Sequence, residues 1–295
     1  MVAAMKVFAP AKINLTLDIT GIRPDGYHLM EMVMQSVSLY DTLKVEKNAE
    51  KGIYFTSDAA YLPTDERNLA VKAAGVFLKH AGIDPGLSIH LTKRIPSGAG
   101  MGGGSADAAA VLVALDRICG TGLPMNELMA LGETIGADVP FCLHGGTALV
   151  KGIGEQVESV CPMPGCFLAV VKPRISVHTK AAFEAFDRGV IHFRPDNEEM
   201  LRAICAKDLS AIASNLCNVF EETAHLEELD AIKSGLMAEG ALGALMTGSG
   251  SAVYGIFAEK EPAMKACGTF RRKKNRYQAF LCEPILSGPV IQMKS

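Results

Sequence analysis

The densest cluster of residues suited to ligand binding is a glycine-rich segment between a predicted strand and a predicted helix. Five of the seven residues from Gly98 to Gly104 are glycines, so the backbone can approach a ligand without intervening Cβ atoms. The following helix starts with unpaired amide groups, which favour anions such as phosphate. The segment is therefore predicted to bind a polyphosphate through Pro96, Ser97, Gly98, Ala99, Gly100, Met101, Gly102, Gly103, Gly104, Ser105 and Ala106.

Other interpretations of this segment fit the sequence less well. A tight turn would need only one or two glycines, and the bare backbone of Gly103 and Gly104 is better explained by phosphates at the helix start. Gly98, Gly100 and Gly103 match the dinucleotide-binding pattern, but no strand with an acidic end follows about 20 residues later. The Walker-type pattern G-x-x-x-x-G-K-[ST] is absent. The role of Ser105 stays open between two alternatives. Its hydroxyl either contacts a phosphate or Mg²⁺, or merely caps the helix.

A lysine and an aspartate far apart in the sequence have surroundings that suggest catalysis. Apolar and polar residues alternate over Ile13–Ile19, which predicts a strand with Lys12 and Asn14 on one face. Lysine is unfavourable inside a strand unless it finds a partner, or unless it guards a sheet edge. Asp138, in the turn after a predicted helix, is a candidate proton acceptor, and the alternative is an aspartate that only caps the turn.

The composition of the 295 residues is that of an ordinary folded protein, with 49% hydrophobic residues and a net charge of −3. A general nucleic-acid binder would usually be basic, so that class is excluded. The apolar runs fall far short of the ~20 residues that a membrane helix needs, so no membrane partner is expected. The eight cysteines form no C-x-x-C pair and the histidines show no ligand spacing, so no metal site is predicted. We expect buried thiols in a reducing compartment, and a cytoplasmic protein.

Strand and helix signals come in runs rather than in strict alternation, which favours an α+β fold. Two lobes are predicted, at residues 1–160 and 161–295. Helices are expected at residues 69–81 (with Asn68 as the N-cap), 106–118, 125–135 and 179–186, and strand or turn signals fill residues 141–160. Strands are expected at residues 13–19, 30–45, 87–95, 167–171, 242–246, 252–258 and 277–282.

Three segments, in order, resemble the motifs of the galactokinase, homoserine kinase, mevalonate kinase and phosphomevalonate kinase (GHMP) superfamily. Pro10–Leu15 resembles the first motif, the glycine-rich segment the second, and Met246–Val253 the third. Thr247 and Ser251 depart from the common pattern, which has serine and proline there, but both residues are small. The resemblance covers nearly the whole chain. It implies a two-lobed GHMP kinase fold, with an N-terminal nucleotide-binding lobe, a C-terminal α/β lobe and an active site in the cleft between them.

Further residues resemble one branch of this superfamily, whose small-molecule substrate is a cytidine-diphosphate-linked methylerythritol. They are Gly21 with Arg23–His28, and Gly136–Phe141 followed by Gly152–Glu155. This resemblance implies ATP-dependent phosphorylation of the 2-hydroxyl of that molecule during synthesis of isoprenoid precursors, with Mg²⁺ as the cofactor. A monomer or a weak homodimer is expected.

The same resemblance implies roles for the catalytic candidates. Lys12 and Asp138 are implied to be a catalytic pair, in which the lysine holds the hydroxyl and the aspartate takes its proton. Asn14 would hydrogen-bond the substrate or organise the pair.

On the substrate side, Tyr27 and His28 are implied to bind the cytidine, with the tyrosine ring near the base and the histidine hydrogen-bonded to its edge. Thr179 and Phe183 align with the cytidine-side wall, although Phe183 is equally well explained as a core residue.

The nucleotide side and the competing functions are less defined. The adenine pocket is expected in Tyr54–Asn68, and Lys93 or Asn68 is a candidate to reach the nucleotide. One competing function is another GHMP kinase acting on a different alcohol, which would have no use for Asp25–His28. The others are a dinucleotide-dependent oxidoreductase, and a nucleotide-binding protein without catalysis, which would lack the lysine or the aspartate.

Overall fold

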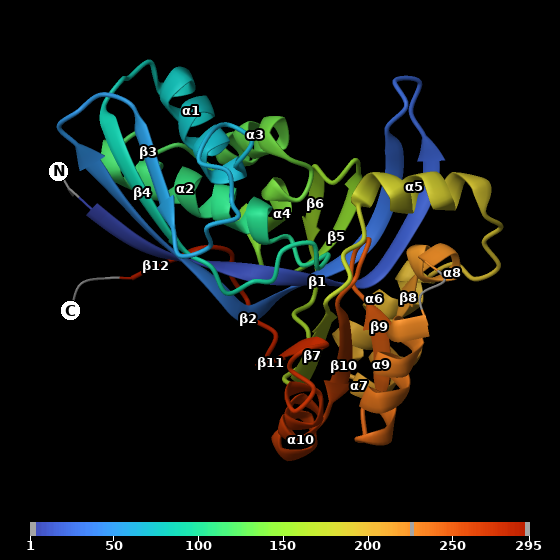
Figure 1. Cartoon of the computed structure of the whole chain (residues 1–295). Helices are drawn as coiled ribbons and strands as arrows, with labels where there is room; N and C mark the ends of the chain where they lie inside the picture. The colour runs from blue at the N-terminus through green and yellow to red at the C-terminus, as the bar shows by residue number, and fades with distance from the viewer. Residues whose placement is uncertain (1–3, 225–226, 293–295) are drawn as a thin grey trace.

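The computed structural model describes residues 4–224 and 227–292, which form two sheets with helices packed on them (Figure 1). Residues 1–3, 225–226 and 293–295, which the predicted lobes include, lie outside the described residues. An eight-stranded mixed sheet lies mainly in the N-terminal half, and a four-stranded antiparallel sheet lies in the C-terminal half. The predicted α+β class is confirmed.

The larger sheet has the strand order β12-β1-β2-β4-β3, with β5 also paired to β2, β6 to β5, and β8 to β1. Its strands are β1 (Ala4–Ile22), β2 (His28–Asn48), β3 (Ile53–Ser57), β4 (Gly86–Thr92), β5 (Thr147–Gly152), β6 (Gln156–Ser159), β8 (Cys217–Asn218) and β12 (Val290–Ile291). Strands β8 and β12 follow residue 160 in the sequence, yet both pair with β1. The boundary between the predicted lobes stays a prediction.

Helices α1 (Leu69–Ala81), α2 (Gly103–Cys119) and α3 (Met125–Ile135) lie over one face of the larger sheet (Figure 1). Helix α1 begins and ends where the sequence predicts: the Asn68 side chain accepts a hydrogen bond of 3.0 Å from the amide of Ala70, and Gly82 has a left-handed φ of 65°. Helix α2 begins at Gly103, three residues earlier than predicted. The glycine-rich segment is therefore a short loop followed by the first turn of a helix.

Strand β1 is irregular where it carries the catalytic candidates. Its pairing with β2 shifts register between Pro10 and Ala11 and again between Asn14 and Thr16. Such bulges bend a strand and change where its side chains point. Lys12 and Asn14 lie between these two bulges. Their side chains share a face, as the sequence predicts, and the Lys12 Nζ donates to the Asn14 Oδ1 at 2.7 Å.

The smaller sheet has the order β11-β7-β10-β9 and both of its faces are covered. Its strands are β7 (Phe167–Pro173), β9 (Gly243–Met246), β10 (Val253–Phe257) and β11 (Tyr277–Cys282). Alternate residues of β7 enter different cores: Leu168 and Val170 join the core beneath the larger sheet, while Ala169 and Val171 pack with helices α9 and α10. The helices of this half are α5 (Thr179–Arg188), α6 (Asn197–Ala206), α7 (Leu209–Ser214), α8 (Val219–Ala224), α9 (Glu227–Ala238) and α10 (Lys260–Arg271).

One predicted segment has a different structure. Strand and turn signals were expected from Phe141 to Val160, but the chain first forms the short helix α4 (Val139–His144) before β5 and β6. Pro140 in the first turn favours this helix, because a proline there has no amide hydrogen that needs a partner. The prediction for residues 141–144 is therefore wrong.

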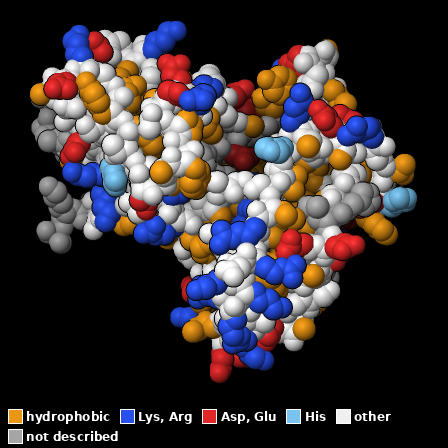
Figure 2. Space-filling view, in the orientation of Figure 1, with side chains coloured by type: hydrophobic (Ala, Val, Ile, Leu, Met, Phe, Trp, Pro, Cys, Tyr) orange, Lys and Arg blue, Asp and Glu red, His pale blue; other side chains and the backbone are white. Residues whose placement is uncertain are grey.

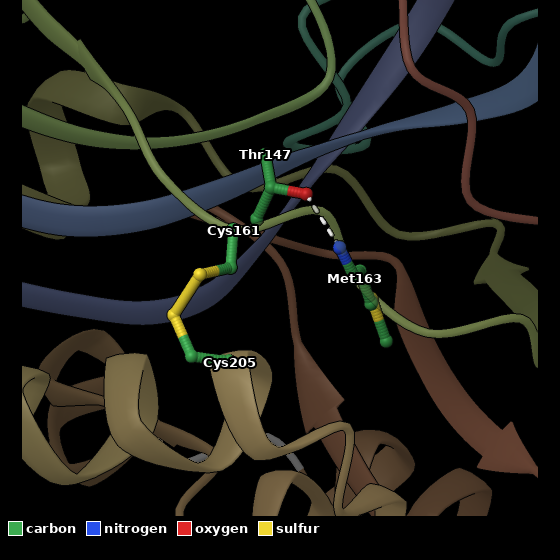
Figure 3. Close-up of a disulfide and its surroundings, with 4 residues drawn as sticks. All are labelled: Thr147, Cys161, Met163 and Cys205. Atoms are coloured by element: carbon green, nitrogen blue, oxygen red, sulfur yellow. Dashed lines mark hydrogen bonds between the residues drawn. A yellow bond between two sulfur atoms is a disulfide. The ribbon is translucent and has the colours of Figure 1, made fainter.

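The cysteines correct another expectation. Cys161, after β6, and Cys205, on α6, form a disulfide with a Cα–Cα distance of 5.2 Å (Figure 3). These residues are 44 positions apart, and their spacing gave no sign that the fold would bring them together. Burial raises the pKa of the thiols of Cys166 and Cys282 to about 12, so these two agree with the expected inert buried thiols.

Candidate active site

A cavity of about 1080 Å³ opens between the helix-covered part of the larger sheet and helix α5. Figure 2 shows this face of the molecule hollowed between the two halves. Most of the predicted site residues line the cavity, and the two exceptions are Asn14 and Ala106. Both are fully buried behind the wall. The amide of Ala106 donates to the Gly102 carbonyl at 2.8 Å inside helix α2, so this residue has no free group for a phosphate, contrary to the prediction.

The glycine-rich loop needs glycine for its backbone path. Gly98, Gly100 and Gly102 have left-handed φ values of 60°, 72° and 67°. Any other residue would lose roughly 1–2 kcal/mol at each of these positions. Gly102 also lies against the catalytic candidates, because a Cβ there would stand 3.0 Å from Lys12 Cγ and 3.8 Å from Asp138 Oδ2. The loop thus brings bare backbone directly beside this pair.

The third motif supports this loop. The amide of Ala252 donates to the carbonyl of Ala99 at 3.2 Å, and the amide of Ser251 donates to the carbonyl of Gly98 at 3.4 Å. A Cβ on Gly100 would overlap the carbonyl oxygen of Thr247. A Cβ on Gly248 of the third motif would likewise lie 2.9 Å from the carbonyl oxygen of Gly100, so these two glycines let the loops pack backbone against backbone.

Gly103 and Gly104 do not have equivalent surroundings. A Cβ on Gly103 would meet Ile95 Cγ2 and Lys93 Nζ, each at 3.0 Å, so this glycine makes room for the protein itself. A Cβ on Gly104 would be 3.4 Å from Leu69 Cδ1, an ordinary contact. Packing against Ile95 and Lys93 is thus a second reason for glycine at position 103, and the expected contact of both glycines with phosphate stays a prediction.

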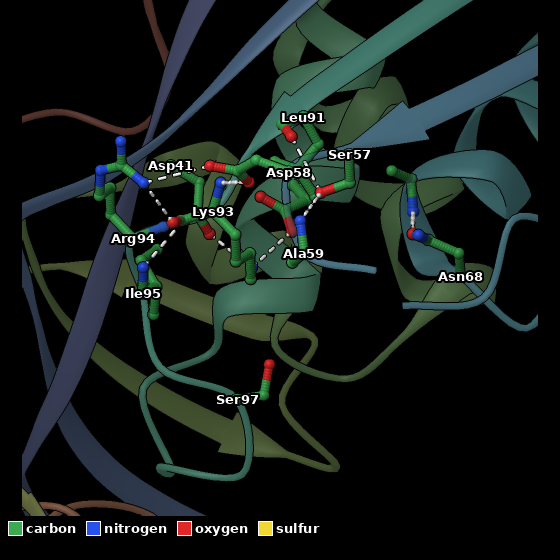
Figure 4. A network of polar contacts seen from close by, with 12 residues as sticks. Asp41, Ser57, Asp58, Ala59, Asn68, Leu91, Lys93, Arg94, Ile95 and Ser97 are labelled. Carbon is green, nitrogen blue, oxygen red and sulfur yellow. Dashed lines mark hydrogen bonds and ion pairs between the residues drawn. The ribbon is translucent and has the colours of Figure 1, made fainter. Parts of the chain in front are cut away.

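A buried charge cluster holds the two ends of the glycine-rich segment together (Figure 4). The Nζ of Lys93 donates to Asp41 at 2.5 Å and to Asp107 at 2.7 Å. The second oxygen of Asp41 accepts from the amides of Arg94 and Ile95. Burial opposes the charge of Lys93, but attraction to Asp107 and Asp41 outweighs it and raises the pKa of the lysine. Lys93 borders the cavity, but its ammonium group already donates hydrogen bonds to Asp41 and Asp107. Contact with the nucleotide stays a prediction for this lysine.

Asp107 is the member of this cluster whose negative charge is least well compensated. Burial raises the pKa of its carboxyl well above the usual value, since the attraction of Lys93 only partly offsets the loss of water and the repulsion of Asp41. Its Oδ1 atom has no hydrogen-bond partner among the described residues. Two carboxylates thus share one ammonium group beneath the first turn of α2.

Lys12 and Asp138 meet at the bottom of the cavity, with 3.8 Å between Nζ and Oδ2. The side chain of Lys12 is 5% exposed and that of Asp138 is 33% exposed, so the lysine is fixed and the carboxylate faces the cavity. Asp138 stands at the N-cap position of α4, but its side chain makes no capping hydrogen bond among the described residues. The turn-capping interpretation of Asp138 therefore has no support in the geometry.

Asn14 and Thr247 fix the position of Lys12. The Asn14 Oδ1 accepts from Lys12 Nζ at 2.7 Å, and the backbone amide of Asn14 donates to Thr247 Oγ1 at 3.1 Å. The Lys12 amide donates to the carbonyl of Met101 at 3.1 Å, which ties β1 to the glycine-rich loop. Of the two roles considered for Asn14, this geometry favours organising the pair.

The α5 end of the cavity carries the predicted substrate residues. The rings of His28 and Phe183 are stacked, with centroids 4.5 Å apart, and Tyr27 lies on the β1–β2 turn with 60% of its surface exposed. Phe183 also packs edge-to-face on Phe220 and lines the cavity. These contacts fit the core role, and its role in the cytidine-side wall stays a prediction. The Thr179 hydroxyl lies 3.1 Å from that of Ser249 in the third motif.

Comparison with known proteins agrees with this arrangement. The model of the GHMP kinases N-terminal domain matches residues 68–146, and the model of the GHMP kinases C-terminal domain matches residues 200–275. The 4-diphosphocytidyl-2-C-methyl-D-erythritol kinase of Caldicellulosiruptor saccharolyticus is 44% identical over 95% of this chain and 94% of its own length. The kinase of the same name from Pelotomaculum thermopropionicum is 46% identical over 90% of this chain and 93% of its own length. The chain belongs to the 4-diphosphocytidyl-2-C-methyl-D-erythritol kinase family.

Solved structures extend the comparison to the fold. A crystal structure of 4-(cytidine 5'-diphospho)-2C-methyl-D-erythritol kinase superposes with a TM-score of 0.81 at 34% identity, covering 95% of this chain and 99% of that one. Homoserine kinase from Cytophaga hutchinsonii superposes with a TM-score of 0.76 at 22% identity, covering 99% and 98%, which shows a common fold alone. The GHMP kinase fold expected from the three motifs is confirmed, and an oxidoreductase is excluded.

Two parts of the site were missed from the sequence. Asp187 lies four residues after Phe183 on α5 and contacts His28, and the helical spacing of these two residues was the available signal. The Asp41 partner of Lys93 comes from a different strand, and its position had no local signal. No helix in the described part of the chain has the length and apolar character needed to cross a membrane.

Proposed function

We propose that this chain transfers the γ-phosphoryl group of ATP to the 2-hydroxyl of 4-diphosphocytidyl-2-C-methyl-D-erythritol. The observation that carries the proposal is the 3.8 Å contact of Lys12 with Asp138 directly beside Gly102. A kinase needs a proton acceptor, a positive charge and a phosphate-binding backbone within reach of one hydroxyl group. All three features converge at this point of the cavity.

In the proposed reaction, the substrate hydroxyl oxygen bonds to the γ-phosphorus while the bond to the β–γ bridging oxygen breaks. The Asp138 carboxylate accepts the hydroxyl proton, and ADP leaves. The ammonium group of Lys12 holds the hydroxyl oxygen and offsets negative charge that develops there. Asn14 keeps this ammonium in place through its 2.7 Å hydrogen bond.

Mg²⁺ is proposed to accompany the nucleotide. In the described ranges, no three His, Cys, Asp or Glu side chains gather into a metal-binding cluster. A nucleotide-borne Mg²⁺ needs only one or two protein oxygens, because phosphates and water complete its shell. Ser105 lines the cavity at the loop, and its hydroxyl would fit this need while Asp138 stays free to accept the proton. When bound, the ion neutralises phosphate charge.

The test is a comparison of alcohols at a fixed ATP concentration. We expect one ADP per phosphorylated product with 4-diphosphocytidyl-2-C-methyl-D-erythritol, and no ADP above background with homoserine or mevalonate. Phosphorus NMR of the product would show whether the 2-hydroxyl carries the new phosphate. ADP formation with homoserine or mevalonate only would replace this proposal by another GHMP kinase activity, and ATP binding without any turnover would point to a protein without catalysis.

A further inference from the structure

The His28 ring is held on two sides at the α5 end of the cavity. Its plane lies 26° from that of Phe183, at a centroid distance of 4.5 Å. Its Nε2 atom is 2.7 Å from Oδ1 of Asp187, and its side chain is only 13% exposed. A half-turn of the ring about the Cβ–Cγ bond would keep the stacking but lose the hydrogen bond, and a smaller rotation would weaken both. The ring therefore has a fixed orientation.

Helix α5 supplies this arrangement from one of its faces. Thr179, Phe183 and Asp187 follow each other at intervals of four residues, so they lie one above another and all line the cavity. Lys180 and Glu184 form an exposed ion pair one position away. The face that meets His28 thus has one aromatic ring for packing and one carboxylate for hydrogen bonding.

The carboxylate also determines which nitrogen of a neutral His28 ring bears the hydrogen atom. An ionised carboxylate can only accept hydrogen bonds, so the Nε2 atom that faces Asp187 must be the donor. In a neutral imidazole the other nitrogen, Nδ1, is then an acceptor. Without Asp187, either ring nitrogen could bear the hydrogen, and the ring could present a donor or an acceptor.

We propose that Asp187 is a positioning residue for base specificity, which holds His28 with Nδ1 as an acceptor for the exocyclic amino group of cytosine. This inference rests on the proposed function, since it concerns the cytidine of that substrate. Uracil has a carbonyl oxygen in place of the amino group, and two acceptors would then face each other. A polar group left without its partner is rejected far more strongly than a small change in size.

The experiment compares wild type, Asp187→Asn and Asp187→Ala with the cytidine substrate and with its uridine counterpart. The asparagine keeps the shape, but its amide can either accept from Nε2 or donate to it. We expect the KM for the cytidine substrate to rise about tenfold in both variants, as for loss of one hydrogen bond to a charged group. The KM for ATP and kcat should stay unchanged, and the preference for cytidine over uridine should fall about tenfold.

A matched control and a spectroscopic signature separate positioning from general stability. His80 and Glu127 form a histidine–carboxylate pair of 2.8 Å outside the cavity, so Glu127→Gln removes a similar contact without touching the site. It should leave both KM values unchanged. Nitrogen-15 NMR of the His28 ring should show a protonated Nε2 and a bare Nδ1 in wild type, and a mixture of forms in Asp187→Asn.

The possible results distinguish failure of the role of Asp187 from failure of the proposed function. If wild type does not phosphorylate the cytidine substrate, the proposed function itself fails. If wild type does so but the Asp187 variants keep the same KM and the same preference for cytidine, the role of Asp187 is refuted. A protonated Nδ1 in wild type would also refute it.

Discussion

The two ends of the cavity are built in different ways. At the phosphate end, the glycine-rich loop is held by backbone hydrogen bonds to the third motif and by the buried cluster of Lys93 with two carboxylates. At the α5 end, exposed or half-buried side chains such as Tyr27 and His28 form the wall. The backbone of the fold fixes the phosphate end. The α5 end depends on contacts between side chains of different segments, such as His28 with Phe183 and Asp187.

Under the proposed function, this difference separates two tasks. Phosphate recognition uses backbone amides, which every member of a kinase superfamily can supply with the same loop. Base recognition uses side chains, which can change without altering the fold. Mutations at the phosphate end should therefore affect stability and ATP together, whereas mutations at the α5 end should affect only the second substrate.

The largest expected effect falls on the pair between the two ends. Asp138→Asn should keep the shape of the cavity but remove the proton acceptor, so kcat should fall about 10²–10⁴-fold. Lys12→Ala should also abolish most turnover, and the double variant should lose little more, because the two groups act as a unit. The measurement is turnover per folded molecule, with binding of both substrates checked by calorimetry. Near-normal turnover of Asp138→Asn would end the proposed mechanism.

The next effect tests the phosphate end. Gly100→Ala should weaken ATP binding and lower stability by about 1–2 kcal/mol, because of its left-handed φ, with a further loss from overlap with Thr247. Gly104→Ala is the matched control, because its Cβ would meet only Leu69 at 3.4 Å, and stability should change by less than about 1 kcal/mol. Urea denaturation and calorimetry with ATP measure both quantities. Equal losses in the two variants would contradict the packing described here.

A smaller effect is expected at the α5 end. Tyr27→Ala should raise the KM for the cytidine substrate by about tenfold, as for loss of one base–aromatic contact. The KM for ATP and the melting temperature should stay the same, because Tyr27 is 60% exposed. Steady-state kinetics with each substrate varied in turn provide the measurement. A parallel rise in both KM values would place Tyr27 outside the substrate side.

The smallest effect is a pH dependence of stability from the buried cluster. Because the folded-state pKa of Asp107 is raised, its contribution to stability is fully present below pH 3.8 and is lost as the pH rises through the folded value. Asp107→Asn mimics the uncharged carboxyl and removes this loss. The stability of the variant relative to wild type should therefore increase as the pH rises from about 4. Urea denaturation of both proteins across that range measures the difference, and a constant difference would contradict the raised pKa.

Local features of the sequence predicted much of the fold and the place of the glycine-rich loop before a helix. Caps such as Asn68 and Gly82 mark helix ends through contacts only a few residues away, and the structure has α1 between them. The glycine-rich loop was visible because its chemistry lies within one continuous segment. By contrast, residues 141–144 of α4 were predicted as strand or turn, because a six-residue helix has too short a pattern to distinguish.

Contacts between distant segments could not be predicted from residue patterns, and the pairing of Lys12 with Asp138 was expected only from the resemblance to the superfamily. The pairing of Lys93 with Asp41, and of Cys161 with Cys205, depends on which strands and helices become neighbours. The side chains that crowd Gly103 could not be predicted either, because Ile95 and Lys93 come from before the loop and meet this glycine only in the folded chain. A single sequence shows which residue types are present, but not which of them share a buried site.

The late strands that join β1 affect how the chain can be made. Val290 and Ile291 pair with Phe8 and Val7, and Cys217 pairs with Thr16. During synthesis on a ribosome, β1 emerges before β8 and β12, and it keeps bare hydrogen-bonding groups along this edge until those two strands have been translated. Such an edge can pair with a neighbouring chain. Strand β12, only two residues long, therefore closes part of an edge that would otherwise be open to association between nascent chains.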